Sequence, residues 1–305
     1  MSRISTQRLR DFIRLLRPHF LLGSLMLFLI GSIHAGEGRI NVDIGLITAI
    51  LTAAMVQLAG QLADDYFDRD GDLPSKRSLF AGGSGVIQSG SFSAGSVLRL
   101  TMAVCVLSII LATAVSVFTD RWLFLPLIAL GLAGGLAYSA PPIRLASTWF
   151  GELSIALLVG VVLPLTGAYY IVGAMDPGVF ALCLPLFFFS LESLVAVQFP
   201  DMEADRASGK RNITLRLGIQ RTKFACMAFI FMGYLAVIVE VMYGSLRAGA
   251  LAILITIPIS LYASWKLVMM KDYDFRISKT VSNLGMTVNG ISMAILLVYV
   301  LFLEN

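Results

Sequence analysis

Two clusters of acidic residues stand out by the type and spacing of their side chains. The first is Asp64-Asp65-Tyr66-Phe67-Asp68-Arg69-Asp70-Gly71-Asp72, and the second, farther along the chain, is Asp201-Met202-Glu203-Ala204-Asp205. Carboxylates this close repel one another unless a cation lies between them. Hard oxygen ligands suit Mg²⁺, which often shares its coordination shell with substrate phosphates. The two clusters therefore predict a site in which magnesium ions hold a diphosphate.

Helical spacing indicates which of these acids act together. On a helix, Asp65, Asp68 and Asp72 would fall within an arc of roughly 60° and span roughly 10 Å of the axis. Asp201 and Asp205 would lie one turn apart on one face, with Glu203 on the other side. We therefore expect the catalytic and metal-binding residues to be Asp65, Asp68, Asp72, Asp201 and Asp205.

The segments that must position these acids are strongly apolar. The chain has 305 residues, of which 57% are hydrophobic and 14% charged, and its mean hydropathy is +0.84, which excludes an ordinary soluble domain. Runs of about 20 apolar residues are typical of transmembrane helices. They predict an all-α fold in one domain, residues 1–305, with nine transmembrane helices bundled around a central cavity open to the cytoplasm. The expected spans are roughly 19–36, 43–63, 94–118, 122–139, 152–173, 178–199, 223–243, 249–265 and 283–303.

The basic residues predict the orientation of this bundle. With the N-terminus inside and the connections alternating, 20 of the 23 Lys and Arg residues are cytoplasmic, and only Arg39, Arg121 and Arg247 lie outside, as the positive-inside rule requires. Residues 1–18 are then a cytoplasmic segment, and 64–93 and 200–222 are cytoplasmic active-site loops. The C-terminus lies outside, in a multi-pass protein of the inner or plasma membrane. Loops facing anionic lipid account for the net charge of +4, so we expect the lipid bilayer as a partner and no nucleic acid.

Further polar residues near the two clusters are candidates for substrate binding. Lys76 and Lys210 each follow an acidic cluster, and Lys76 precedes a glycine-rich turn, 81–85. For Lys76 and the glycines, a phosphate-binding or lid role and a plain glycine-rich turn remain alternatives. For Lys210, the alternative to phosphate binding is the positive-inside rule alone. Tyr138 and Arg144 flank paired prolines between two spans, and Glu192 and Gln198 occupy the span that carries the second cluster. An ionisable side chain inside a span normally faces a polar cavity.

These motifs together resemble the UbiA-type superfamily of intramembrane prenyltransferases over nearly the whole chain. The NDxxDxxxD signature of that family corresponds to Asp64-Asp65-xx-Asp68-xxx-Asp72, and its DxxxD signature to Asp201-xxx-Asp205. Other segments are similar to its menaquinone-pathway branch, namely Arg17-Pro18, Tyr138-Ser139-Ala140-Pro141-Pro142, Gly151-Glu152 and Gly209-Lys210-Arg211. The resemblance makes Arg17 and Asp64 further substrate-binding candidates.

The resemblance implies an activity and a set of partners. Mg²⁺ held by the aspartates would neutralise the diphosphate of a polyprenyl diphosphate, and an aromatic acceptor would attack the allylic carbon. In the menaquinone branch the acceptor is 1,4-dihydroxy-2-naphthoate, which is our first expectation. Two departures concern the acceptor: Asp64 replaces the usual asparagine, and Val197-Gln198-Phe199-Pro200-Asp201 replaces the NNxRD of the menaquinone enzymes.

Other acceptors and other classes of protein remain alternatives at this point. Within the same reaction class the acceptor could be a hydroxybenzoate, a tocopherol precursor, haem, chlorophyllide or a glycerol-phosphate lipid. A CDP-alcohol phosphotransferase also uses aspartates with Mg²⁺, but in one continuous motif. A cation transporter would favour acids near the bilayer midplane, whereas only Glu192 lies there.

Overall fold

The structure is a computed structural model that describes residues 2–71 and 80–302. This part of the chain folds into helices and contains no strand. The first half contains α1 (Ser2–Leu16), α2 (Pro18–Ala35), α3 (Ile44–Phe67), α4 (Ala94–Thr119), α5 (Phe124–Ser139) and η1 (Leu145–Ser147). The second half contains α6 (Gly151–Leu157), η2 (Leu158–Val162), α7 (Leu163–Val172), η3 (Pro177–Val179), α8 (Phe180–Ala207), α9 (Ile213–Met242), η4 (Ala248–Thr256), α10 (Ile257–Met269) and α11 (Phe275–Phe302).

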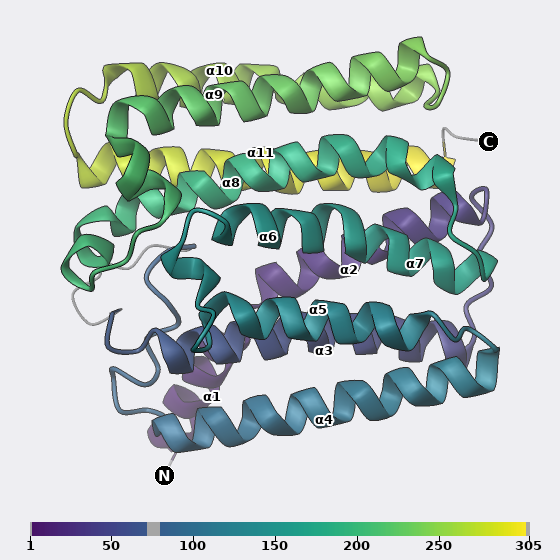
Figure 1. Ribbon diagram of the computed structural model, residues 1–305, viewed down its shortest axis with the longest axis horizontal. Coiled ribbons are helices and arrows are strands. Elements are labelled where there is room, and N and C mark those ends of the chain that lie inside the picture. The colour runs from purple at the N-terminus through teal and green to yellow at the C-terminus, as the bar shows by residue number, and fades with distance from the viewer. Residues whose placement is uncertain (1, 72–79, 303–305) are drawn as a thin grey trace.

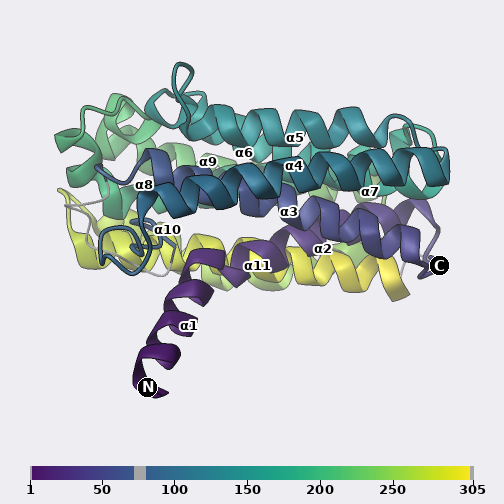
Figure 2. The ribbon, with the colours of Figure 1, turned by 90° about the horizontal axis from the view of Figure 1, so that it is seen from below.

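The long helices lie side by side in one bundle, with α4 at one edge and α9 and α10 at the other (Figure 1). The N-terminus and the connection between α3 and α4 lie at one end of the bundle, and the C-terminus lies at the opposite end. Helix α1 leaves the bundle at an angle to the other helices (Figure 2). The break between α1 and α2 is at Arg17, whose backbone is left-handed with φ 42°.

Eight helical segments of the described chain are long and apolar enough to cross a membrane. The segment Gly151–Val172 is one of them, because α6, η2 and α7 continue one another. Helix α5 is apolar but has only 16 residues, about 24 Å at 1.5 Å per residue, which is short of the roughly 30 Å hydrocarbon core. The expected nine spans therefore stay a prediction, with α5 the doubtful one.

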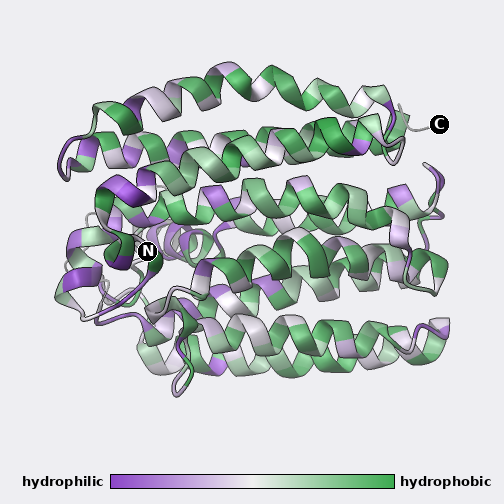
Figure 3. Ribbon diagram, turned by 45° about the horizontal axis from the view of Figure 1, so that its top comes forward, coloured by the Kyte–Doolittle hydropathy of each residue, from purple (hydrophilic) through white to green (hydrophobic). Residues whose placement is uncertain are grey.

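The two largest of the four apolar clusters that the described residues form in the interior lie on either side of α2. One cluster is centred on α3, α4 and α5, and the other on α8, α9 and α11, while α2 contributes Phe28 to the first and Ile30 to the second. Many large apolar side chains point outward, including Val106 on α4 and Phe231 on α9, which are 60% and 62% exposed. Hydrophobic residues cover the lengths of the helices, and hydrophilic ones gather at the end that holds the N-terminus (Figure 3). A bundle with apolar flanks suits a lipid environment.

Close approach of backbones holds α2 against α7. A Cβ built on Gly31 would lie 1.9 Å from the carbonyl oxygen of Pro164, and one built on Gly167 would lie 2.1 Å from that of Phe28. Only glycine leaves room for this contact. Small residues at such contacts let membrane helices gain dispersion energy without a hydrophobic driving force. This contact joins the two halves of the bundle near its centre.

Candidate active site

The first acidic cluster begins in the last turn of α3, where Arg17 contacts two carboxylates. The Arg17 guanidinium hydrogen-bonds to Asp65 and lies 3.8 Å from Asp64 Oδ2. The Ser139 hydroxyl donates to the other oxygen of Asp64 at 2.9 Å. Arg17 reaches these acids because the left-handed break between α1 and α2 places it at the same end of the bundle. Arg17, a substrate-binding candidate from the resemblance, thus lies against the first cluster.

The predicted helical stripe does not extend beyond Asp68, and this part of the expectation was wrong. Helix α3 ends at Phe67, Asp68 is its C-cap residue, and a turn follows to Gly71. Asp and Gly are poor helix formers, and no apolar residue among 68–71 draws the chain back to the core. Asp72 and Lys76, the remaining candidates of this segment, lie outside the described residues.

The second acidic cluster lies on α8, which continues without a break through Pro200 to Ala207. Asp201 and Asp205 are one turn apart on this helix, Asp205 is buried, and Glu203 is exposed. The expected geometry of these three residues is confirmed. The Tyr273 hydroxyl donates to the Pro200 carbonyl at 2.9 Å and so holds the helix where the proline occurs.

Lys210 joins the two clusters. Its ammonium donates to Asp68 Oδ2 at 2.7 Å and lies 3.1 Å from Asp205 Oδ1. Burial lowers the pKa of Lys210, but the charges of Asp205 and Asp68 outweigh burial and raise that pKa well above its usual range. Arg144 adds a longer contact to Asp68 at 3.4 Å, and the Asn212 amide donates to Asp205 at 2.7 Å. Acids separated by four spans in the sequence thus form one cluster.

The glycine-rich turn lies over both acidic clusters. The Gly82 amide donates to Asp201 Oδ2 at 3.1 Å, and the Ser84 amide donates to Asp65 Oδ1 at 2.9 Å. Gly82, Gly83 and Gly85 have φ angles of 84°, 63° and 75°, a region that side chains with a Cβ seldom adopt. The sequence suggested a phosphate-binding or lid role for this turn, but its amides are directed at carboxylates here. The run of glycines was the feature of the sequence that could have predicted these contacts.

A polar group beside the acids involves Gln198, Thr214 and Glu152. The Gln198 amide nitrogen donates to Glu152 Oε1, and Gln198 Oε1 accepts from the Thr214 hydroxyl at 2.5 Å. Tyr138 lies at the end of α5, next to Ser139, whose hydroxyl donates to Asp64. Sequence reasoning named Glu152 only as part of a motif and did not predict its place beside the acids.

Glu192 does not join this site. Its carboxyl faces α11, where a Cβ built on Gly285 would lie 3.0 Å from Glu192 Oε2. The side chain is 3% exposed, and Oε2 has no hydrogen-bond partner among the described residues. The expected role of Glu192 in substrate binding stays a prediction. In the structure its carboxyl lies against α11 and not beside the acids.

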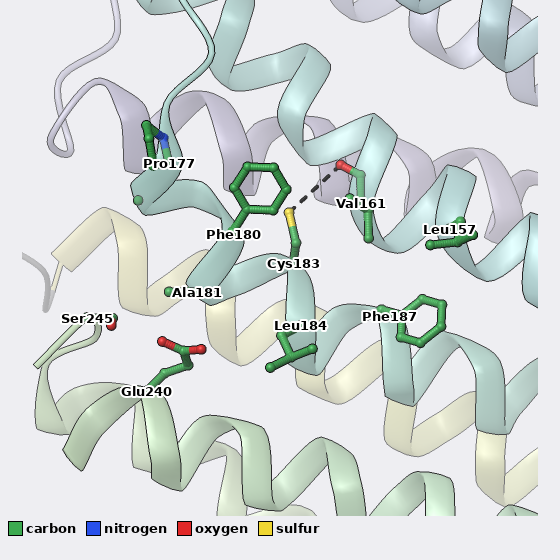
Figure 4. Close-up of a pocket in the computed structure, with 11 residues that line it drawn as sticks. Leu157, Val161, Pro177, Phe180, Ala181, Cys183, Leu184, Phe187, Glu240 and Ser245 are labelled. Atoms are coloured by element: carbon green, nitrogen blue, oxygen red, sulfur yellow. Dashed lines mark hydrogen bonds between the residues drawn. The ribbon is translucent and has the colours of Figure 1, made fainter. Parts of the chain in front are cut away.

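A cavity of about 760 Å³ lies elsewhere, between α6, η2, α8 and α9 (Figure 4). Its walls are mostly apolar, and Cys183 in its wall donates a weak hydrogen bond to the Val161 carbonyl. Glu240 and Ser245 lie at one side of the cavity. It contains none of the acids described above. The acids form the candidate active site instead, because their charges and hydrogen bonds converge at one place.

The carboxylate oxygens of the two acidic clusters fit a divalent cation. Asp65 Oδ2 and Asp201 Oδ1 are buried and lack a hydrogen-bond partner among the described residues. Four carboxyl groups, those of Asp64, Asp65, Asp68 and Asp205, contact three cations, those of Arg17, Arg144 and Lys210, and Asp201 accepts a hydrogen bond from the Gly82 amide. In the described part of the chain, no three acidic, His or Cys side chains form a ready metal cage. Mg²⁺, which keeps several waters and binds through one or two carboxylates plus phosphate, does not require such a cage.

Comparison with known proteins identifies relatives of the chain. Residues 24–300 match the model of the UbiA prenyltransferase family. The chain is 24% identical over 246 residues to the 1,4-dihydroxy-2-naphthoate octaprenyltransferase of Bacillus subtilis strain 168, covering 80% of this chain and 78% of that protein. It is 28% identical over 249 residues to the digeranylgeranylglyceryl phosphate synthase of Methanoregula boonei, covering 74% and 81%. The fold matches that of a UbiA homologue from Archaeoglobus fulgidus bound to GPP and Mg²⁺, with a TM-score of 0.70, 21% identity and coverage of 95% and 98%.

Proposed function

Because the chain belongs to the UbiA prenyltransferase family, we propose that it transfers a polyprenyl group from an allylic polyprenyl diphosphate to an aromatic acceptor, with 1,4-dihydroxy-2-naphthoate as the first candidate. Family membership makes the chain a membrane-embedded prenyltransferase and removes the transporter and phosphotransferase alternatives. The identity of the acceptor, the roles of individual residues and the orientation in the membrane are the parts that we propose.

One observation carries the proposal: carboxylates from α3 and α8 alternate with cations from three other segments. Arg17 contacts Asp65, Arg144 contacts Asp68, and Lys210 lies between Asp68 and Asp205. A diphosphate with bound metal needs both kinds of group, because the metal requires carboxylates and the phosphate oxygens require cations. We propose that the three cations transfer their contacts from carboxylates to phosphate oxygens when the donor binds.

The chemistry follows from this exchange of partners. Mg²⁺ held by Asp65, Asp68, Asp201 and Asp205, and by Asp72, would neutralise the diphosphate and make it a better leaving group. Lys210, Arg17 and Arg144 would hold the departing oxygens in fixed positions, and electrostatic preorganisation of this kind is a major source of catalysis. The allylic carbon becomes cationic as its C–O bond breaks, so water must be excluded. Placement at the end of a lipid-embedded bundle serves that requirement and admits the apolar tail.

Two observations support 1,4-dihydroxy-2-naphthoate as the acceptor. The Bacillus subtilis relative is named for 1,4-dihydroxy-2-naphthoate, and the Gly151-Glu152 segment resembles that branch of the family. Archaeal digeranylgeranylglyceryl phosphate synthases are 28% and 26% identical over 74% and 87% of this chain. A glycerol-phosphate lipid is therefore our second candidate acceptor.

We further propose that the end of the bundle with the acids faces the cytoplasm. The N-terminus and the acidic clusters share this end, and the basic connections near it satisfy the positive-inside rule. Residues 1–18, 64–93 and 200–222 would then be cytoplasmic or interfacial, the C-terminus would be outside, and the protein would reside in the plasma membrane. Much of 64–67 and 200–207 is helical, so these active-site segments are helix ends followed by loops.

The test is prenyl transfer by the purified protein in lipid nanodiscs. Labelled polyprenyl diphosphate is supplied with Mg²⁺ or EDTA and with dihydroxynaphthoate, hydroxybenzoate or a glycerol-phosphate lipid. We expect Mg²⁺-dependent product with dihydroxynaphthoate, and product with another acceptor alone would contradict our first candidate.

The matched control pair is Asp201→Asn and Glu203→Gln, because both side chains lie on α8 and only Asp201 faces the cluster. Asp201→Asn should lose most Mg²⁺-dependent turnover, and Glu203→Gln should keep it. Equal activity of the two variants would remove Asp201 from the proposed metal site.

A further inference from the structure

Glu152 is a buried acid with one oxygen available for a ligand. Its side chain is 2% exposed, at the start of α6 and directly against α8. Oε1 accepts a hydrogen bond from Gln198, whereas Oε2 has no hydrogen-bond partner among the described residues. A buried carboxyl oxygen without a partner is costly. Its retention suggests that a partner arrives with a substrate.

The neighbours of Glu152 fix which oxygen is free. The Thr214 backbone amide donates to Gln198 Oε1 at 3.3 Å, and the Thr214 hydroxyl lies 2.5 Å from the same oxygen. A backbone N–H can only donate, so the Gln198 carbonyl must face Thr214 and its NH₂ must face Glu152. The carboxyl is therefore held in place through Oε1, and Oε2 can accept a proton or a hydrogen bond.

The position of Glu152 relates it to the diphosphate site. Its partner Gln198 lies one turn before Asp201 on α8, and Thr214, which bonds to Gln198, lies two residues after Asn212, whose amide donates to Asp205. Glu192 provides a contrast, because it is similarly buried with one oxygen that lacks a hydrogen-bond partner among the described residues, but its carboxyl faces Gly285 of α11. Of these two buried glutamates, only Glu152 adjoins the proposed donor site.

We propose that Glu152 binds the hydroxyl group of the prenyl acceptor through Oε2 and takes its proton during transfer. The proposal rests on the proposed prenyl transfer and adds the residue that receives the acceptor. It requires only that the acceptor carry a hydroxyl group, so it applies to both candidate acceptors.

For a hydroxynaphthoate the step balances as follows. The O–H proton moves to Glu152 Oε2, the ring carbon that bears the carboxylate forms a bond to the allylic carbon, and the allylic C–O bond breaks with its electron pair leaving on the diphosphate. The bond to the carboxylate then breaks, CO₂ leaves, and its electron pair restores the aromatic ring. Glu152 returns the proton to the ring oxygen. The net products are the prenylated diol, CO₂ and diphosphate.

The test compares wild type, Glu152→Gln and Glu152→Asp in nanodiscs with the same donor. Two rates are measured: transfer to the acceptor, and cleavage of the donor to prenyl alcohol without acceptor. General-base catalysis typically contributes about 10²–10⁴-fold, so Glu152→Gln should lower transfer by roughly 100-fold or more. Donor cleavage, and the thermal stabilisation given by Mg²⁺ with a non-cleavable donor analogue, should stay at the wild-type level. The transfer rate of Glu152→Asp should lie between those of wild type and Glu152→Gln.

Acceptors with one hydroxyl group O-methylated provide a second measurement. Methylation of the hydroxyl that Glu152 binds should slow wild-type transfer strongly and change the residual rate of Glu152→Gln little. Wild-type transfer rates in Glu152→Gln would overturn the proposal, as would parallel loss of transfer, donor cleavage and donor-analogue stabilisation, which would indicate a structural role. Absence of transfer by the wild type with every acceptor would instead contradict the proposed function itself.

Discussion

Replacement of Lys210 by methionine tests whether the Lys210 ammonium occupies a position between Asp68 and Asp205 that Mg²⁺ would otherwise take. The Lys210 ammonium contacts Asp68 and Asp205 at 2.7 and 3.1 Å, and the side chains of these three residues are 14%, 7% and 11% exposed. Methionine keeps the apolar stem, so the change removes chiefly the charge. The two acids would remain buried without their shared cation.

The expected magnitude follows from the degree of burial. Removing one partner of a buried ion pair costs about 3–5 kcal/mol, because the remaining charge is uncompensated. We take about 3 kcal/mol, since the site is at the end of the bundle. This energy equals roughly a hundredfold in an equilibrium constant. Lys210→Met should therefore melt at a lower temperature than wild type without Mg²⁺. It should need up to roughly a hundredfold less Mg²⁺ for half-maximal stabilisation, because the ammonium no longer competes.

The assay is thermal unfolding in nanodiscs across a Mg²⁺ titration, with Lys271→Met as control because Lys271 is exposed. The raised pKa of Lys210 means that its stabilisation is fully present below the pKa of an unfolded lysine, near 10.4. It is lost only as pH rises through the still higher folded value. The part of the difference in melting temperature between Lys210→Met and Lys271→Met that arises from ionisation of Lys210 should therefore be constant from pH 7 to pH 9. Equal melting of Lys210→Met and Lys271→Met without Mg²⁺, or an unchanged Mg²⁺ midpoint, would refute the reasoning.

Two further predictions use pairs of glycines that differ in their surroundings. Gly82 and Gly90 both have positive φ, at 84° and 73°, but only the Gly82 amide contacts Asp201. Gly82→Ala should therefore slow prenyl transfer more than Gly90→Ala. Similar transfer rates in the two variants would argue against a role for the glycine-rich turn. Gly31→Ala should destabilise the bundle by about 1–3 kcal/mol through overpacking, since its Cβ would lie 1.9 Å from the Pro164 carbonyl. Gly23→Ala on the same helix meets nothing within 4 Å and should be nearly neutral, as thermal unfolding of both would show.

Local sequence signals predicted the helical spacing of the second acidic cluster correctly, but not the end of the helix that carries the first. The spacing of Asp201, Glu203 and Asp205 was interpreted correctly because α8 is helical throughout this segment. The same reasoning overextended α3, since periodicity does not state where a helix stops. The turn after Phe67 is favoured by Asp70 and Gly71, whose low helix propensity carried less weight in the sequence reasoning than the spacing of the acids.

The sequence by itself determined that this is an all-helical membrane protein, and it predicted that two acidic clusters form the candidate active site. Hydrophobic runs, charge bias and residue spacing are local properties of the chain, so they need no knowledge of how helices meet. Only the tertiary structure decided which groups partner the acids. Lys210 links Asp68 to Asp205, Arg17 reaches Asp65, and Glu152 meets Gln198. The Lys210–Asp205 contact spans only 5 positions. The other contacts join residues 46 to 142 positions apart, and they depend on packing of helices across the bundle, which no local pattern encodes.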